Sequence, residues 1–521
     1  MKNYLKSLGL CAALLVFYNC SSSGDEPVAP PATQKAMASI VATLATAMEP
    51  ATNGEFTLKL SKSVATETIL NLKLSGTAKN GEDYKLIGST ILIPAKSTLV
   101  VLPIEILADQ IVEGDETVVA TISIDNNANV LLGTETSAVI TIKDGAIIVD
   151  LKPGETRSYM VDKNATDETV ALFYNLKKIA KTSFILGQQD AMISNYQTAT
   201  PGNTDIKKIT GNDPGLNGLD FMFITDDQNT GEEGNWYYGQ EKMIIEGAVR
   251  AYDRGMINTF SWHIREPYEG KVFSTETMSA TIKSKAFKSI LVGGENHEYY
   301  KKKLDKVGQV FKNLKGSDGK LIPVIFRPWH EFDGNWFWWG AAYCTPAEFK
   351  QNYQFTVTYL RDVLGVKNLL FAFSPDQGWN SESEYLSRYP GDAFVDVLGF
   401  DDYEDFKNKG ESGVNNANKK LQIISKLAKE RVKIAALTET GYIIKPSAPA
   451  TFISNLYTNN YYRAMTDNNI EISYMAFWNN GSDSYSTPIS SSPYENDFVQ
   501  FTRKDKVVLL NKLPNMYKLP Q

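Results

Sequence analysis

The segment Arg327–Gly340 of this 521-residue sequence combines a carboxylate with a dense group of aromatic residues. Glu331 follows an apolar run, residues 322–326, that is typical of a buried strand, and five aromatic residues lie within positions 332–339. A carboxylate at the end of a strand beside flat aromatic faces suits a sugar, because the acid can protonate a glycosidic oxygen while the rings stack on the pyranose. On these residues alone, an aromatic core with one solvated glutamate explains the pattern equally well.

A second glutamate, Glu439, lies 108 positions after Glu331, which equals three units of 36 residues. Glycoside hydrolysis uses two carboxylates, one as an acid and one as a nucleophile or base. If each unit is one strand and one helix of a barrel, the two glutamates stand on the fourth and seventh strands and converge at its mouth. A pair separated by about 5–5.5 Å would act with retention of configuration, and one pKa of the pair would be raised. The alternative for Glu439 is an ion-paired glutamate at a strand end.

Strand and helix patterns alternate from about residue 165 onward, which predicts a parallel sheet with crossover helices. Residues 298–314 and 419–430 have the helical spacing of apolar residues. Eight strands over roughly 350 residues predict an α/β fold, a (β/α)8 TIM barrel. A doubly wound sheet is the second choice, because no glycine-rich turn follows the first strand. The expected strands are 184–187, 221–225, 256–262, 323–327, 369–374, 395–400, 434–438 and 472–477.

Polar residues gather where these strands end, which is where such barrels carry their active sites. Two of the three histidines of the chain, His263 and His330, are among them. This concentration is the main argument from the residues for an active site. The strand ends concerned are Gln188–Asp190, Trp262–Arg265, His330–Glu331, Asp401–Tyr403, Glu439 and Trp478–Asn480.

Residues 36–145 predict an all-β domain, an antiparallel sandwich of short β-branched runs separated by Gly, Asn, Asp and Pro. Gly81–Tyr84, Ile93–Lys96 and Asp109–Glu116 resemble the Calx-beta family, in which acidic loop residues bind calcium. Acidic loops on a spacer domain are the favoured interpretation, because the ligand spacing is not regular. The residues available to a calcium ion are Asp83, Asp109, Glu113, Asp115 and Glu116.

The N-terminus has the pattern of a secretory signal, with an apolar run at Leu8–Tyr18 that is too short to span a bilayer. The position of Cys20 resembles a bacterial lipoprotein cleavage site, although Phe17–Asn19 departs from the usual pattern. Ser21–Glu26 resembles the acidic export signal of Bacteroidetes surface lipoproteins. We expect lipidation at Cys20 and anchoring to the outer membrane, exposed on the cell surface, with periplasmic or secreted protein as the alternatives. The expected parts are a signal peptide 1–19, a tether 20–35, the β-domain 36–145, a linker 146–165 and the barrel 166–515.

Composition excludes several classes of function. The net charge of -7 argues against a nucleic-acid partner, because no basic surplus can neutralise phosphates. Three histidines do not supply a multi-histidine metal centre, and His330 and Glu331 are not part of a His-Glu-x-x-His motif. We therefore expect no metal and no cofactor. Cys344 is the one thiol after Cys20, so a disulfide framework is not expected.

Four ordered motifs between about 170 and 510 resemble glycoside hydrolase family 26, the β-mannanase family of clan A. The resemblance implies a (β/α)8 barrel, retaining chemistry and an endo-acting enzyme on β-1,4-mannan, glucomannan or galactomannan. The motifs are Arg327–Glu331 with Gly334–Trp339, Tyr389–Tyr403, Thr438–Gly441 and Ser261–His263.

The resemblance also implies a role for each site residue. Glu331 would be the acid/base and Glu439 the nucleophile, held by a hydrogen bond from Tyr403. The other expected site residues are His263 on the −1 sugar, His330 on hydroxyls near the reacting carbon, Trp336 and Trp478 along the subsites, and Arg327 as an orienting charge or a plain salt bridge. Trp338 and Trp339 are candidates for core packing.

Two departures from the family pattern concern the substrate. Phe332–Asp333 follows Glu331 where the family often has small polar residues or Asn, and strand three continues as Ile264–Pro267. Lichenase and β-1,3-xylanase therefore remain alternatives within the family. A non-catalytic surface glycan-binding lipoprotein is the alternative from another class, but a binder has no need of the glutamate pair.

Overall fold

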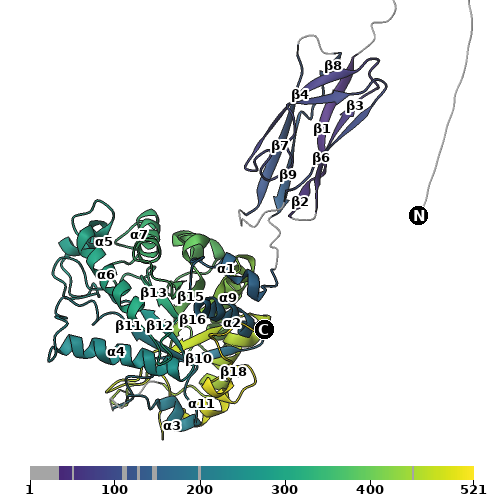
Figure 1. Cartoon of the computed structure of the whole chain (residues 1–521). Helices are drawn as coiled ribbons and strands as arrows, with labels where there is room; N and C mark the ends of the chain where they lie inside the picture. The colour runs from purple at the N-terminus through teal and green to yellow at the C-terminus, as the bar shows by residue number, and fades with distance from the viewer. Residues whose placement is uncertain are drawn as a thin grey trace, which may run out of the picture. The chain divides into compact units, whose positions relative to one another are not determined.

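A computed structural model describes residues 35–49, 52–107, 114–125, 129–143, 149–197, 201–448 and 451–520. The chain forms two compact units, one up to Gly145 and one from Ala146 (Figure 1). Within the described residues, no helix is long and apolar enough to cross a membrane. The expected signal peptide and Cys20 lie outside the described part of the chain.

The N-terminal unit is a β-sandwich, which confirms the predicted β-rich domain. Alternating side chains from both sheets, such as Phe56, Leu58, Ile122 and Ile140, form its core. One sheet has the order β6 (Leu99–Ile104), β3 (Gly54–Leu60), β1 (Ala36–Leu44), β8 (Val130–Leu132). The other has the order β2 (Thr46–Met48), β9 (Ser137–Lys143), β7 (Glu116–Ser123), β4 (Thr68–Gly76), β5 (Thr90–Ile93).

Two details of the sandwich differ from the prediction. β1 pairs with β8 in parallel, and β2 pairs with β9 in parallel, so the sheets are not purely antiparallel. The β-branched runs expected in this domain (55–60, 68–74, 89–93, 99–106, 117–124 and 138–142) do not include β1, because its three alanines dilute the β-branched pattern. Of the acidic loop residues, Asp109 and Glu113 lie outside the described part of the chain, Asp115 pairs with Lys143, and Asp83 accepts a hydrogen bond from the Lys79 amide at 2.6 Å.

The second unit is the predicted (β/α)8 barrel. Eight parallel strands follow one another in chain order, and β10 pairs with both β11 and β17, which closes the barrel and rules out a doubly wound sheet. Each of the eight strands contributes one or two buried apolar or aromatic residues to a common core cluster. The strands are β10 (Phe184–Gln189), β11 (Leu216–Asp220), β12 (Ile257–Ser261), β13 (Val324–Arg327), β14 (Leu369–Phe373), β15 (Val397–Asp402), β16 (Ile434–Thr440) and β17 (Tyr474–Phe477), with the short β18 (Val507–Val508) beside β10.

Helices cover the outside of the barrel (Figure 1). The helix predicted at 298–314 is α6 (His297–Asn313), and the one predicted at 419–430 is the C-terminal half of α9 (Gly410–Glu430). The other long helices are α2 (Asp167–Ala180), α4 (Trp236–Asp253), α5 (Ala280–Ile290) and α7 (Pro346–Thr358). Shorter ones are α1 (Thr156–Tyr159), α3 (Asp205–Thr210), α8 (Glu382–Tyr385), α10 (Tyr462–Thr466) and α11 (Glu495–Thr502).

The second barrel strand was wrongly placed by the sequence pattern. The apolar run 221–225 predicts a strand, but β11 is the segment Leu216–Asp220 that precedes it. Its Asn and Gly resemble a turn, yet Gly218 is required there because an added Cβ would lie 2.1 Å from Gln189 Oε1 on the neighbouring strand. The correction moves the functional end of this strand to Asp220.

Candidate active site

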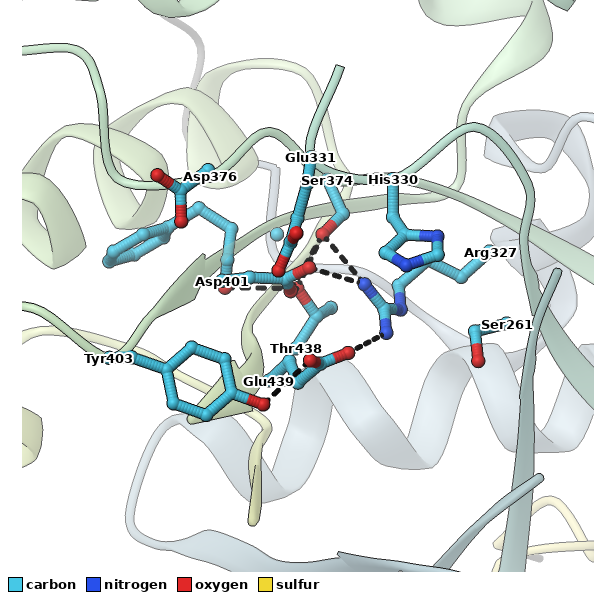
Figure 2. Close-up of polar contacts among 12 residues, drawn as sticks. Ser261, Arg327, His330, Glu331, Ser374, Asp376, Asp401, Tyr403, Thr438 and Glu439 are labelled. Atoms are coloured by element: carbon cyan, nitrogen blue, oxygen red, sulfur yellow. Dashed lines mark hydrogen bonds and ion pairs between the residues drawn. The ribbon is translucent and has the colours of Figure 1, made fainter. Parts of the chain in front are cut away.

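Glu331 and Glu439 converge at the carboxyl ends of β13 and β16 (Figure 2). One carboxylate oxygen from each lies within 4.8 Å of the other, and an oxygen of Asp401 joins them within the same distance. Glycosidases that act with retention hold their two carboxyl groups about 5–5.5 Å apart, whereas inverting enzymes leave room for a water between them. The geometry therefore suits attack by one glutamate rather than by a water placed between the two.

Glu331 is held in an unusual backbone conformation just after β13. Its φ is 51°, in the left-handed region that costs a non-glycine residue about 1–2 kcal/mol. Its amide donates to Ser374 O at 2.9 Å, and Trp336 Nε1 donates to its Oε2 at 2.5 Å. Burial, followed by the charges of Glu439, Asp401 and Asp376, raises the pKa of Glu331 well above its usual range. Its environment thus favours the protonated form that a general acid needs.

Glu439 has a different set of partners. The Tyr403 hydroxyl donates to Oε1 at 2.6 Å, and Arg327 Nη2 donates to Oε2. Both oxygens therefore accept hydrogen bonds, as an ionised carboxylate does. Burial and the nearby Glu439 raise the pKa of Tyr403 well above its usual range, so the phenol remains a donor.

Arg327 forms a buried salt bridge, one of the two alternatives expected for it. It donates to Glu439 through one nitrogen and to Asp401 Oδ2 at 2.5 Å through the other. Asp401 also accepts from Ser374 Oγ at 2.9 Å and from Thr438 Oγ1 at 2.7 Å (Figure 2). Burial raises the pKa of Asp401 despite the opposing effect of Arg327. The sequence pattern placed Asp401 at a strand end but gave it no role.

The three carboxylates are the one group of this kind, within the described ranges, whose geometry could hold a metal ion. Arg327 already donates to two of them and supplies a positive charge inside the group. The arrangement is therefore an internally paired network of the type that positions a nucleophile, and it lacks the histidine or cysteine ligands that a zinc site uses.

His263 and His330 meet beside this network. Their Nε2 atoms are 3.2 Å apart, and His263 Nδ1 lies 2.6 Å from Asp220 Oδ2. Burial, Arg327 and His263 together lower the pKa of His330 well below its usual range, so this imidazole is neutral. Sequence reasoning missed Asp220, because it placed the second strand too late. An acidic residue directly before the apolar run was the available signal.

The aromatic residues of the opening motif divide into two groups. Trp338 and Trp339 are fully buried, and their Nε1 atoms donate to Ile264 O and His330 O, so they belong to the core as expected. Trp336 is 42% exposed and touches Glu331, and Trp478 is partly buried with its ring 6.2 Å from that of His263. The motif therefore contains an aromatic core and one exposed ring, that of Trp336, beside Glu331, and Trp478 adds a partly buried ring from outside the motif.

Two further acids lie next to Glu331. Asp333 Oδ1 accepts a hydrogen bond from the Asp376 amide at 2.6 Å. Burial, then the charge of Asp376, raises the pKa of Asp333 to about 7, and burial raises that of Asp376 to about 6. This is the position where the chain departs from the family pattern, and it adds negative charge near the acid/base candidate.

Comparisons with known proteins agree on one family. The model of Glycosyl hydrolase family 26 matches residues 161–483, and that of the Calx-beta domain matches residues 33–146. A mannan endo-1,4-beta-mannosidase of Bifidobacterium adolescentis is 34% identical over 363 residues, 67% of this chain and 35% of that protein. One of Bacillus subtilis is 25% identical over 205 residues, 38% of this chain and 52% of that protein. The chain thus spans about a third to a half of these curated relatives.

Solved structures give the same result for the barrel. GH26C from a Muricauda species is 55% identical, with a TM-score of 0.70, and the match covers 71% of this chain and 99% of that one. The GH26 beta-mannanase of Bacteroides ovatus is 32% identical with a TM-score of 0.58, covering 68% of this chain and 98% of that one. Both similarities concern the part of the chain that carries the two glutamates.

Proposed function

The chain belongs to glycosyl hydrolase family 26, and we propose that it is a retaining endo-β-1,4-mannanase acting on mannan, glucomannan or galactomannan. The observation that carries the proposal is the convergence of Glu331 and Glu439 within 4.8 Å, where burial raises the pKa of Glu331 and where Tyr403 and Arg327 donate to the two oxygens of Glu439. The names of the curated relatives support β-1,4-mannan as the substrate.

In the first step, a carboxylate oxygen of Glu439 attacks the anomeric carbon of the −1 sugar. The bond to the glycosidic oxygen breaks, and that oxygen takes the proton of Glu331, which releases the part of the chain on the leaving side. In the second step, Glu331, now ionised, accepts a proton from water while the water oxygen attacks the same carbon. Glu439 leaves as a carboxylate, and Glu331 is protonated again.

The surrounding residues prepare these steps. Arg327 and Tyr403 fix both oxygens of Glu439, which keeps the nucleophile in one orientation. Trp336 holds Glu331 and offers an exposed ring to a sugar. His263, His330 and Trp478 follow β12, β13 and β17, and the ring of His263 lies near the other two rings, where we expect all three side chains to contact the −1 sugar.

A panel of polysaccharides tests the substrate. The purified protein is incubated with carob galactomannan, konjac glucomannan, lichenan and β-1,3-xylan, and product lengths are read over time. Release of mixed oligosaccharides from the mannans supports the proposal. Products from lichenan alone or from β-1,3-xylan alone would identify the protein as a lichenase or a β-1,3-xylanase. If none of the four polysaccharides gave products, the alternative of a non-catalytic glycan-binding protein would be favoured. The E439A variant serves as the inactive control.

We propose further that the protein is a lipoprotein anchored to the outer membrane through Cys20. The apolar run Leu8–Tyr18 and the acidic segment after Cys20 support this localisation. A labelled fatty acid should enter the wild-type protein in cells but not a C20A variant. Periplasmic or secreted protein would show no such label.

The β-domain supports a role as a spacer better than one as a glycan-binding module. Residues 36–145 contain two aromatic residues, Phe56 and Tyr84. Both are buried in the sandwich, so neither offers a flat face to a sugar ring.

A further inference from the structure

Asp220, at the end of β11, has two partners for each of its carboxylate oxygens. Its Oδ1 accepts from the backbone amides of Met222 at 2.6 Å and His263 at 3.2 Å. Its Oδ2 accepts from Ser261 Oγ at 2.7 Å and lies 2.6 Å from His263 Nδ1. Because a backbone amide can only donate, the position of Oδ1 must be occupied by an acceptor.

This arrangement determines where His263 carries its proton. Two backbone amides donate to Oδ1 of Asp220 and the Ser261 hydroxyl donates to Oδ2, so three donors point at this side chain as they would at an ionised carboxylate. Asp220 is therefore a carboxylate, which can only accept. A neutral His263 must then be protonated at Nδ1, which leaves a lone pair at Nε2.

The protonation state of His263 also determines which nitrogen of His330 carries a proton. Its Nε2 lies 3.2 Å from His263 Nε2, which carries a lone pair, so His330 Nε2 must donate. The depressed pKa keeps this ring neutral, so Nδ1 carries no proton. Nδ1 is buried without a hydrogen-bond partner, and the positive charge of Arg327 nearby favours a lone pair there. Figure 2 shows His330 beside Arg327, with Ser261 on the neighbouring strand.

We propose that Asp220 is a positioning residue that sets the hydrogen-bond direction of the His263–His330 pair. The hydrogen on His330 Nε2 and the lone pair of His263 Nε2 are then used by each other, and the ring nitrogen of the pair left without a partner is His330 Nδ1, which keeps a lone pair. In the reverse direction, His330 Nδ1 would carry a proton, and the site would contain a buried donor beside Arg327 in place of an acceptor.

The variant Asp220→Asn reverses the direction with little change of shape. The two backbone amides select the amide oxygen for the position of Oδ1, so the NH2 group must face Ser261 and His263 Nδ1. That group can only donate, which forces His263 into the Nε2–H form. His263 then donates to His330 Nε2, and the proton of His330 moves to Nδ1.

Nitrogen NMR of the histidine side chains measures these protonation states directly. The chain has three histidines, and the third, His297, serves as an internal reference, because its Nδ1 lies 2.9 Å from Ile290 O and must donate. The spectrum is recorded on the full chain at pH 8, above the range in which histidines usually titrate. We expect His263 protonated at Nδ1 and His330 at Nε2 in the wild type, and both reversed in D220N.

A matched control is Asp226→Asn, which neutralises a buried carboxylate in the loop after β11 that pairs with Arg265 at 2.6 Å. It should leave the His263 and His330 signals unchanged. The proposal is overturned if wild-type His263 carries its proton at Nε2 or is doubly protonated at pH 8, or if D220N keeps the wild-type pattern. If D220N fails to fold, the wild-type spectrum alone still tests the proposed protonation of His263 and His330.

The effect on catalysis rests on the proposed function. D220N should lower kcat/KM on galactomannan on the order of 10-fold to 100-fold, the effect of mismatched buried hydrogen bonds. A reversed NMR pattern with unchanged kcat/KM would show that the hydrogen-bond direction of the histidine pair has no effect on catalysis and would overturn this part of the proposal. A wild-type protein without activity on any mannan would refute the proposed function but not the NMR assignment.

Discussion

Arg327 and Glu439 form a buried ion pair at the mouth of the barrel, and the other side of the same guanidinium holds Asp401. One cation therefore lies between two carboxylates that would otherwise repel each other. Arg327 and Tyr403 together fix the two oxygens of Glu439, one oxygen each.

Removing this cation should damage both stability and activity. In R327M, Asp401 and Glu439 lose their shared partner inside the protein, and breaking a buried pair from one side costs about 3–5 kcal/mol. Thermal unfolding should show a marked loss, and kcat should fall by more than about 100-fold. The control is R463A, because Arg463 makes exposed pairs with Glu411 and Asp467 that are worth at most about 1 kcal/mol. Equal losses in both variants would contradict the role given to Arg327.

The raised pKa of Glu331 predicts a stability that depends on pH. A carboxyl whose pKa is higher in the folded than in the unfolded protein holds its proton longer when folded. Its favourable contribution is complete below the unfolded value and is lost as the pH rises through the folded value, at about 1.4 kcal/mol per pH unit within that window. E331Q, which cannot ionise, should therefore gain in unfolding free energy relative to wild type between pH 5 and pH 8. A constant difference across that range would contradict the raised pKa.

The phenol of Tyr403 should matter for catalysis more than for stability. Y403F removes the donor to Glu439 Oε1 and keeps the ring, so kcat should fall on the order of 10-fold to 100-fold with little change in KM. Y385F is the matched control, because the Tyr385 hydroxyl donates to Gly399 O, in the core of the barrel wall. That variant should lose stability and keep kcat, and the opposite pattern would refute the assignment.

Trp336 should tune the acid as well as contact the sugar. Its indole N–H favours the ionised form of Glu331, so W336F should raise the pKa of Glu331 further. The alkaline limb of kcat/KM, which reports loss of the proton from the acid, should move to higher pH. W338F removes a buried indole that bonds Ile264 O and should lower the melting temperature without moving that limb. An unchanged limb in W336F would contradict the proposed contact.

Much of the barrel could be predicted from the sequence, because buried parallel strands are nearly continuous apolar runs. β13 and β16 are of this kind, and their ends brought Glu331 and Glu439 together as expected. β11 is not an apolar run, because Asn217 donates a hydrogen bond to Asn258 on the next strand and the missing side chain of Gly218 leaves room for Gln189. Local composition therefore pointed to the apolar run that follows, and Asp220 was missed.

The partners of the site residues could not be predicted, because they depend on contacts between strands far apart in the sequence. Arg327 reaches Asp401 and Glu439 from a different strand, and nothing in its own motif identifies them. The exposure of the tryptophans could not be predicted from the sequence either. Trp336 and Trp339 have similar neighbours in sequence, yet only the first is exposed.

The most direct test of the central claim is a search for the glycosyl-enzyme on Glu439. E331A lacks the acid and the base, so it should still react with an aryl β-mannoside that has a good leaving group but should hydrolyse the intermediate slowly. Intact mass spectrometry should then show the addition of one glycosyl unit, and peptide mapping should place it on Glu439. No adduct, an adduct on another residue, or near-normal turnover of mannan by E439A would contradict the account.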